Sequence, residues 1–152
     1  MRIVFLGTSA FAVPPLSALS ASVHEVPLVV TRPDRHAGRG RRLRASPVKE
    51  RAVEIGLPII QPEKINTRAA RAVIRDAEPD VLVVASFGQI LRPLMLNLAP
   101  KGCLNVHASI LPRHRGASPI NAAILEGDEE VGVTIMRMDE GLDSGDIGLV
   151  GT

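Results

Sequence analysis

Short apolar runs alternate with helix-like segments along almost the whole chain, and this alternation restricts the fold more than any other feature of the sequence. The apolar runs predict strands at residues 2–6, 26–31, 57–61, 81–85, 103–107, 131–138 and 147–150. The segments between them predict helices at about 13–20, 46–56, 66–77, 93–98 and 118–125. The sequence therefore predicts an α/β fold: a Rossmann-like, doubly wound open sheet, mostly parallel, whose ligands lie beyond the carboxyl ends of the strands.

Individual residues mark the centre of the sheet and the starts of several helices. The run Val81–Ala85 is apolar throughout, as expected of a central strand covered on both faces. Ser46 and Ser118 each precede a proline, so each is expected to be an N-cap followed by proline in the first turn. Asn66 is expected to cap the helix that follows it.

The length and composition fit a single compact domain over residues 1–152, with 45% hydrophobic and 22% charged residues. The single cysteine, Cys103, excludes an internal disulfide and a cysteine-cluster metal site. The apolar runs are far shorter than the roughly 20 residues of a membrane helix, and the first residues do not resemble a secretory signal. We therefore expect a cytoplasmic protein with no membrane partner.

Positive charge is concentrated in one segment, residues 32–51, which holds eight Lys or Arg against two acidic residues, whereas the whole chain has a net charge of +2. Residues 32–45 contain few apolar side chains and two glycines, which predicts a long exposed loop. A charge run of this kind is usually only a solvated surface, but six arginines within it also suit contacts with nucleic-acid phosphates. The chain has three Phe and no Trp or Tyr, so recognition by base stacking is not expected.

Two polar side chains share one face of the strand at 103–107. Asn105 and His107 are two residues apart, so both should point into the same cleft at the carboxyl end of that strand. A buried histidine is often a structural residue, but burying both side chains without partners would cost about 1 to 3 kcal/mol for each unpaired group. Asp143, in the glycine-containing loop 139–145, could reach His107 if the strand before that loop also runs parallel. Alone, such an acidic turn is usually just solvated.

The turn after the first strand, residues 7–12, lies where a dinucleotide-binding fingerprint would lie. It contains one glycine, Gly7, where that fingerprint requires three. A nicotinamide or flavin site is therefore not expected, and the segment is interpreted as a simple strand-to-helix turn.

Three segments resemble the signatures of the folate-dependent formyltransferases: Asn105-Val106-His107, residues 109–116 and residues 142–146. Residues 3–8, 11–12, 32–40 and 46–49 also look like members of this family, so the resemblance covers essentially the whole chain. It implies the formyltransferase fold and transfer of a formyl group from 10-formyltetrahydrofolate to an amine, without a metal. It also implies that the chain is truncated at the C-terminus, within the catalytic domain and without the smaller C-terminal β-barrel domain.

The resemblance also assigns site residues. It implies Asn105, His107 and Asp143 as the catalytic residues. Folate contacts are expected from Phe87, Gly88, Gln89, Ile90, Leu91, Ser109, Leu111, Pro112, Asp139 and Gly141. His114 occupies a position where many relatives carry an aromatic residue, and it is expected to be an exposed loop residue without a catalytic role.

The basic segment distinguishes between members of the family. In those that formylate methionyl initiator tRNA for translation initiation, the matching loop enters the acceptor arm. The resemblance thus implies tRNA contacts from Arg39, Arg41, Arg42 and Arg44. Two alternatives remain open: a formyltransferase for a small amine, such as a nucleotide sugar or glycinamide ribonucleotide, and a noncatalytic RNA- or folate-binding module. The oligomeric state is not predicted.

Overall fold

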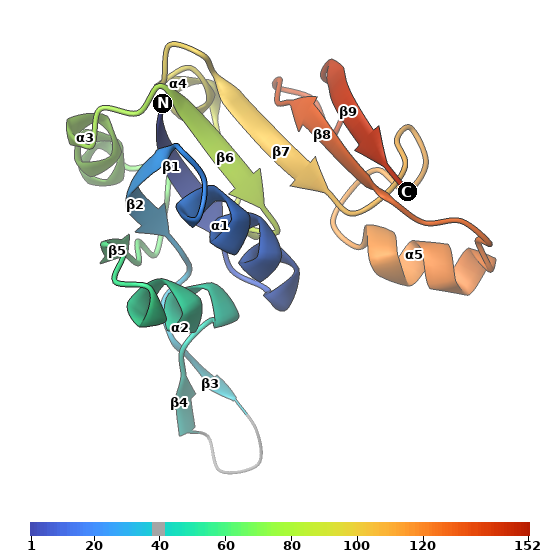
Figure 1. Cartoon of the computed structure of the whole chain (residues 1–152), viewed down its shortest axis with the longest axis horizontal. Coiled ribbons are helices and arrows are strands. Elements are labelled where there is room, and N and C mark those ends of the chain that lie inside the picture. The colour runs from blue at the N-terminus through green and yellow to red at the C-terminus, as the bar shows by residue number, and fades with distance from the viewer. Residues whose placement is uncertain (38–41) are drawn as a thin grey trace.

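The computed structural model describes residues 1–37 and 42–152. Within them, a seven-stranded sheet has the strand order β5-β2-β1-β6-β7-β8-β9 (Figure 1). The first five strands in this order run parallel, and β8 and β9 are antiparallel to their neighbours. The strands span Arg2–Gly7 (β1), Glu25–Val30 (β2), Ile59–Ile60 (β5), Val81–Ala85 (β6), Cys103–His107 (β7), Val133–Arg137 (β8) and Ile147–Gly151 (β9). The predicted open, mostly parallel α/β sheet is confirmed.

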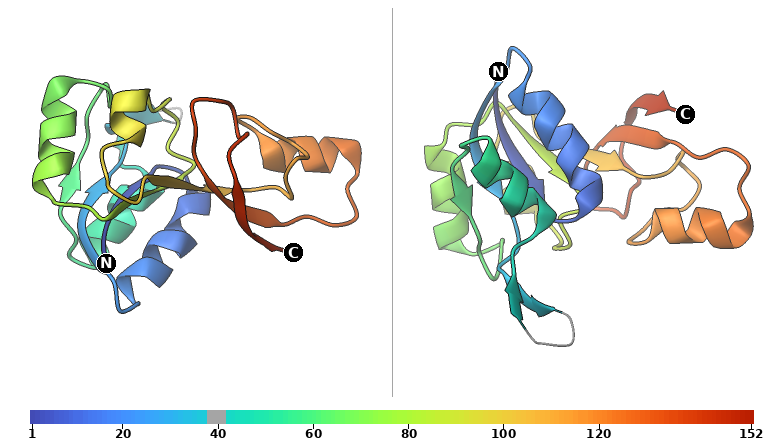
Figure 2. Two further views of the ribbon diagram at one scale, coloured as in Figure 1. Left: turned by 90° about the horizontal axis from the view of Figure 1, so that it is seen from above. Right: turned by 60° about the horizontal axis from the view of Figure 1, so that its bottom comes forward.

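Helices cover both faces of the parallel part of the sheet (Figure 2). They span Val13–Ser20 (α1), Pro47–Glu54 (α2), Arg68–Asp76 (α3), Pro93–Leu96 (α4) and Pro119–Glu126 (α5), with a short 3-10 helix at Ala10–Ala12. α1 and α2 pack on one face, and α3 and α4 pack on the other. α5 lies beyond β7, away from this layered body (Figures 1 and 2).

The core follows from the two-residue period of the central strands. In β1, Val4 and Leu6 join the cluster under α3 and α4, whereas Ile3 and Phe5 join the cluster under α1 and α2. All five residues of β6 are buried. Each large apolar side chain buried in this way contributes about 1.5–3 kcal/mol, so the two clusters fix the sheet as a rigid support for the loops at its edge.

The helix starts agree only partly with prediction. Ser46 caps α2 as expected, because its Oγ accepts from Lys49 N at 3.0 Å. The expected cap at Asn66 is wrong: Thr67 caps α3 by accepting from Ala70 N at 3.2 Å. The Asn66 amide instead bonds Ile90 O and Arg92 N, because the chain after β6 passes beside it. Ser118 precedes α5 without a capping hydrogen bond from its side chain.

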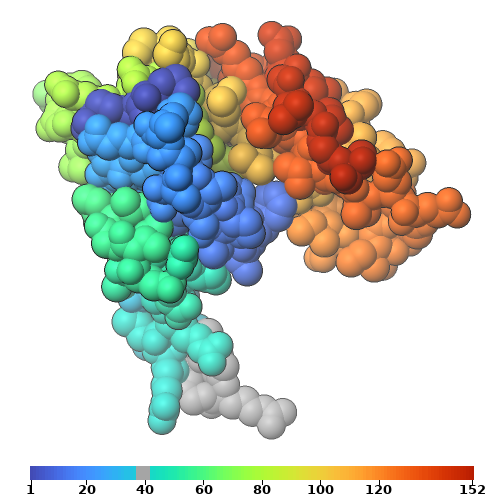
Figure 3. Space-filling view, in the orientation of Figure 1, coloured from blue at the N-terminus to red at the C-terminus, as the bar shows by residue number. Residues whose placement is uncertain are grey.

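The basic segment is not wholly irregular, and this corrects the prediction of a loop. β3 (Arg35–Ala37) and β4 (Arg42–Arg44) pair antiparallel and form a two-stranded ribbon, here called the basic hairpin. It projects from the body of the molecule beyond the edge of the sheet at which β1, β2 and β6 end (Figures 1 and 3). Strands of three residues without apolar alternation leave no pattern in the sequence that would predict them.

An ionic contact anchors the base of the basic hairpin. Asp34 accepts from Lys49 Nζ at 2.7 Å and from Gln61 Nε2 at 2.7 Å. These hydrogen bonds, first that of Lys49 and then that of Gln61, lower the pKa of the Asp34 carboxyl below its ordinary value. Gln61 Nε2 also donates to Arg32 O at 3.0 Å, so both the side chain and the backbone at the base are fixed.

The sequence predicts no helix that spans a membrane. None of the helices formed by residues 1–37 and 42–152 is long and apolar enough to cross a membrane.

Candidate active site

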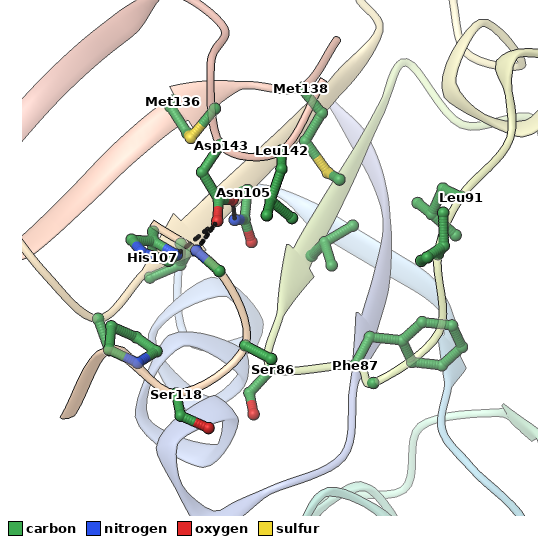
Figure 4. A pocket seen from close by; sticks show the side chains of 18 of the residues that line it. Ser86, Phe87, Leu91, Asn105, His107, Ser118, Met136, Met138, Leu142 and Asp143 are labelled. Carbon is green, nitrogen blue, oxygen red and sulfur yellow. Dashed lines mark hydrogen bonds and ion pairs between the residues drawn. The ribbon is translucent and has the colours of Figure 1, made fainter. Parts of the chain in front are cut away.

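A cleft of about 680 Å³ lies at the carboxyl ends of β1, β6 and β7. These strands are neighbours in the sheet, so the segments that follow them come together at one edge. The lining consists of Ser9, Phe11 and segments 84, 86–91, 105–108, 116–121, 136 and 138–143. The fold therefore gathers loops from distant parts of the sequence around one cavity, drawn in Figure 4.

Asn105, His107 and Asp143 meet in this cleft (Figure 4). Asn105 Nδ2 donates to Asp143 Oδ1 at 3.3 Å, and His107 Nδ1 lies 3.7 Å from Asp143 Oδ2. The backbone N–H of Gly116 donates to the same Oδ2 at 2.8 Å. The side chains of His107 and Asp143 are only 6% and 12% exposed, so their polar atoms interact with little screening by water.

The route by which Asp143 reaches His107 differs from the expected one. β8 runs antiparallel to β7, so the condition of a parallel strand is not met, and Met138 just after β8 lies beside Cys103 at the start of β7. The chain then doubles back through a loop closed by Arg137 N donating to Asp146 O at 2.8 Å. Asp139 Oδ1 accepts from Gly141 N at 2.9 Å and from Ser144 Oγ at 3.0 Å, which fixes the turn. Asp143 thereby returns toward the carboxyl end of β7.

The two ring nitrogens of His107 have different partners. Nε2 lies 2.9 Å from the backbone oxygen of His114. A carbonyl oxygen can only accept, so Nε2 carries the hydrogen and donates it. Nδ1 is then the nitrogen that faces Asp143. The Asn105 amide has two N–H groups and gives one to Asp143, which leaves the second for a bound molecule.

The cleft includes most of the expected folate residues. All of Phe87–Leu91 line it, as do Asp139 and Gly141. The Gln89 side chain is bound to Ile65 N and Pro62 O, so it holds the segment in place.

Ser109, Leu111 and Pro112 lie outside the lining of the cleft, so folate contacts from these three residues stay a prediction. Ser109 Oγ donates to Arg113 O at 2.7 Å, and Leu111 N donates to Thr134 Oγ1 at 3.1 Å. Leu111 and Pro112 are joined by a cis peptide bond. Ser109 and Leu111 thus make hydrogen bonds within the fold and support the turn behind His107.

Comparison with known proteins decides the family, because residues 1–151 match the formyl transferase family. The chain belongs to this family. It is 54% identical over 147 residues to a methionyl-tRNA formyltransferase of Hydrogenovibrio crunogenus, covering 97% of this chain and 47% of the relative. It is 53% identical over 148 residues to the methionyl-tRNA formyltransferase of Chromobacterium violaceum, covering 97% of this chain and 48% of the relative. The chain thus spans about half the length of the curated relatives it matches.

Solved structures confirm the formyl transferase fold. A phosphoribosylglycinamide formyltransferase from Anaplasma phagocytophilum has a TM-score of 0.77 at 19% identity, covering 99% of this chain and 70% of that one. Glycinamide ribonucleotide transformylase 1 from Symbiobacterium toebii has a TM-score of 0.75 at 22% identity, covering 99% of this chain and 72% of that one.

Several groups that line the cleft were not predicted from the sequence. Ser9 and Ser86 line it, and the Ser9 hydroxyl donates to the Ser86 hydroxyl at 2.7 Å. The first residues of α5 form another wall. Ser9 and Ser86 follow β1 and β6, so their positions at strand ends could have indicated them. The Gly116 N–H left no such signal, because only the folded loop directs it at Asp143.

The predicted nucleic-acid contacts fall into two groups. Arg39 and Arg41 lie outside the described residues. Arg42 and Arg44 are exposed on β4 of the basic hairpin.

One cluster among the described residues has the donor types of a metal site: His114, Glu126 and Asp128, whose ligand atoms lie within 4.8 Å of one another. Arg113 Nη2, however, donates to Glu126 at 3.1 Å and to Asp128 at 2.5 Å, so an arginine of this chain already binds both carboxylates. The imidazole of His114 is only 6% exposed, so the expectation of an exposed loop histidine is wrong. Asp128, two residues past the end of α5, gives this ring a largely buried partner.

Proposed function

We propose that this chain carries the formyl-transfer centre of an enzyme that formylates the amino group of methionyl initiator tRNA, with 10-formyltetrahydrofolate as the donor. The observation that carries the proposal is the meeting of Asn105, His107 and Asp143 in one cleft. The relatives named methionyl-tRNA formyltransferase, at 54% and 53% identity, support the choice of substrates. Residues 1–152 are taken as part of the catalytic domain of a cytoplasmic translation enzyme.

The cleft fits a folate donor in size and character. Its volume of about 680 Å³ lies within the range of about 300–1,000 Å³ that is typical of small-molecule sites. Phe87, Leu91 and Met138 supply apolar surface for a flat ring, and the backbone of segment 87–91 supplies polar groups at its edge. Asp139 and Gly141 lie in the loop that carries Asp143, so the ring would bind beside the reacting group.

In the reaction, the amine attacks the formyl carbon and negative charge develops on the formyl oxygen. Hydrogen-bond donors directed at that oxygen stabilise the tetrahedral state. The second N–H of Asn105 is one such donor, and a protonated Nδ1 of His107 is the other. Because Nδ1 lies 3.7 Å from Asp143, beyond ordinary hydrogen-bond distance, its hydrogen is not committed to that carboxylate and can be donated to a bound oxygen.

Asp143 is the group that moves the proton in this reaction. A new C–N bond forms to the amine, the C–N bond to the donor breaks, and one proton must pass from the attacking nitrogen to the departing one. The Asp143 carboxylate faces the protonated ring, takes up the amine's proton through water and passes it on to the departing nitrogen by the same route. Gly116 N and Asn105 Nδ2 orient the carboxylate for this step.

The basic hairpin is the part proposed to contact tRNA. Arg42 and Arg44 present two exposed positive charges, and Arg39 and Arg41 are proposed as further contacts. Contacts of this kind depend on phosphate charge and weaken as salt is added.

The experiment that tests the proposed function measures formyl transfer by this chain from 10-formyltetrahydrofolate to methionyl initiator tRNA. The parent should produce formylmethionyl-tRNA, and His107→Ala should not. His24→Ala, which changes a histidine between α1 and β2, is the matched control and should retain the parent rate. Equal rates for His107→Ala and the parent would refute the catalytic assignment.

Two parallel assays separate the alternative functions. Transfer to glycinamide ribonucleotide but not to methionyl-tRNA would indicate a small-amine enzyme. Binding of folate or tRNA without turnover, unchanged by His107→Ala, would indicate a binding module.

A further inference from the structure

A second histidine–carboxylate pair lies directly behind His107. The imidazole of His114 is bonded through Nε2 to Asp128 Oδ2 at 2.5 Å, and the two side chains are only 6% and 13% exposed. The backbone of His114 has a φ of +54°, a left-handed conformation that is unfavourable for a residue with a side chain. The ring–carboxylate contact thus holds a residue that would otherwise favour another backbone conformation.

The backbone of His114 in turn holds His107. Its carbonyl oxygen accepts from His107 Nε2 at 2.9 Å, which keeps the hydrogen on Nε2 and leaves Nδ1 facing Asp143. If the His114 carbonyl turned away, Nε2 would lose its acceptor and the ring could exchange its hydrogen between the two nitrogens. The conformation at His114 therefore determines which nitrogen faces the reacting groups.

The position of Asp128 is fixed by contacts at the C-terminal end of α5. Gly127 ends the helix with a φ of +69°, and Asp128 N donates to Ala123 O at 3.0 Å. Arg113 Nη2 binds the second carboxylate oxygen of Asp128 at 2.5 Å. Since the first residues of α5 line the cleft, one helix touches the cleft at its start and carries Asp128 just beyond its end.

We propose that His114 and Asp128 are positioning residues of the transfer site: their buried contact holds the His114 carbonyl against Nε2 of His107 and so directs Nδ1 toward Asp143. The catalytic consequence rests on the proposed function, whereas the effect on the His107 ring does not. The pair does not contact the reacting atoms. It acts through the hydrogen-bonding state of His107.

The test uses Asp128→Ala, with Glu129→Ala as the matched control. Glu129 is the next residue, it is exposed, and its replacement removes the same charge from the same turn. Asp128→Asn is the conservative variant, because its amide oxygen can still accept from His114 Nε2. His114→Gly is the second test, since glycine adopts the left-handed conformation without the ring and should still fold if Asp128→Ala does not.

The first readout is the tautomer of His107, measured from imidazole nitrogen signals in a long-range ¹H–¹⁵N NMR spectrum and assigned by comparison with His107→Ala. In the neutral form of the ring, the parent and Glu129→Ala should show hydrogen on Nε2 alone, and protonation for the reaction then adds the second hydrogen at Nδ1. Asp128→Ala and His114→Gly should show a mixture of tautomers, and Asp128→Asn should restore most of the parent signal. A parent-like His107 ring in a folded Asp128→Ala or His114→Gly chain would overturn the proposal.

The second readout is formyl transfer. Asp128→Ala should lower kcat by about 10- to 100-fold with little change in the KM of the donor, as expected for a small displacement of a reacting group. An equal reduction in Glu129→Ala, or an effect confined to KM, would also overturn the proposal. If the parent transfers no formyl group, the proposed function fails while the tautomer measurement still decides the role of the pair.

Discussion

Asn105 and Asp143 lie side by side although the strands that lead to them run in opposite directions. The Asn105 amide donates to Asp143 at 3.3 Å, yet on β8 the residue opposite Asn105 is Met136. The chain must therefore pass the end of β8 and reverse before it delivers the carboxylate. The position of Asp143 depends on the closed loop 137–146 rather than on the direction of the strand.

Asp143→Asn should abolish most of the transfer activity. The amide keeps the size of the carboxylate but has no charge to face a protonated His107, and its NH₂ group would oppose one of the two donors, Gly116 N or Asn105 Nδ2. Loss of a group that transfers protons lowers rates by about 10²- to 10⁴-fold, so the rate constant of single-turnover formyl transfer should decrease by a factor in this range.

Asp146→Asn is the control for this prediction. Asp146 lies in the same loop and is exposed, and its backbone oxygen accepts the bond that closes the loop. This variant should retain the parent rate. A similar decrease in both variants would mean that charge in the loop, rather than the Asp143 carboxylate, controls the rate.

The sequence predicted the centre of the sheet better than its C-terminal edge. β6 and β7 have the expected bounds, because their apolar runs are long enough to define a buried strand. The direction of β8 could not be predicted, because α5 lies between β7 and β8 and resembles a crossover helix. In the structure α5 leaves Ile124 and Leu125 72% and 86% exposed and does not cross the sheet. Periodicity indicates that a segment is helical, but it does not indicate which surface that helix packs against.

In the candidate site, too, the sequence predicted some features and not others. The alternation along β7 places Asn105 and His107 on one face by local geometry alone, so the sequence could pair them. The contacts from Gly116 N and from the His114 carbonyl depend on the fold of loop 108–117, and loop conformation has no periodic signal.

Arg42→Ala and Arg44→Ala should each weaken binding of tRNA. Both side chains lie on the exposed basic hairpin, and removing one arginine–phosphate interaction should reduce the salt dependence of log Kd by about 1. Filter binding of initiator tRNA over a series of salt concentrations measures this slope. Arg75→Ala, on the exposed surface of α3, is the matched control and should leave both affinity and slope unchanged. Unchanged slopes in all three variants would remove the hairpin from the tRNA interface.

Asp34→Asn should make stability less sensitive to acid. Hydrogen bonds from Lys49 and Gln61 lower the pKa of Asp34 from 3.8, so the folded chain holds the charged form more strongly than the unfolded chain does. The resulting stabilisation is present above the unfolded pKa and is lost as the pH falls through the folded pKa. In urea unfolding, the parent should lose more stability than Asp34→Asn below about pH 4.

Two further variants check the cause of this acid sensitivity. Lys49→Met should reproduce most of the effect, since Lys49 makes the largest contribution. Asp76→Asn removes an exposed carboxylate whose ion pair with Arg75 is 3.4 Å long, and it should respond to pH as the parent does. An identical pH response in the parent, Asp34→Asn and Lys49→Met would contradict the lowering of the Asp34 pKa by these hydrogen bonds.

Gly7→Ala should destabilise the chain, because the end of β1 has no room for a methyl group. An added Cβ would lie 2.7 Å from Phe5 Cε1, 2.9 Å from Ala12 Cβ and 3.0 Å from Ala85 O. Gly7 pairs with Ala85 in the centre of the sheet, so the backbone cannot move aside. Overpacking of this kind costs about 1–3 kcal/mol, which urea unfolding at neutral pH would measure. Gly151→Ala, whose added Cβ would have no atom beyond its chain neighbours within 4 Å, should change the midpoint little. Equal midpoints for both variants would show that the turn relaxes, and that its single glycine is not required for packing.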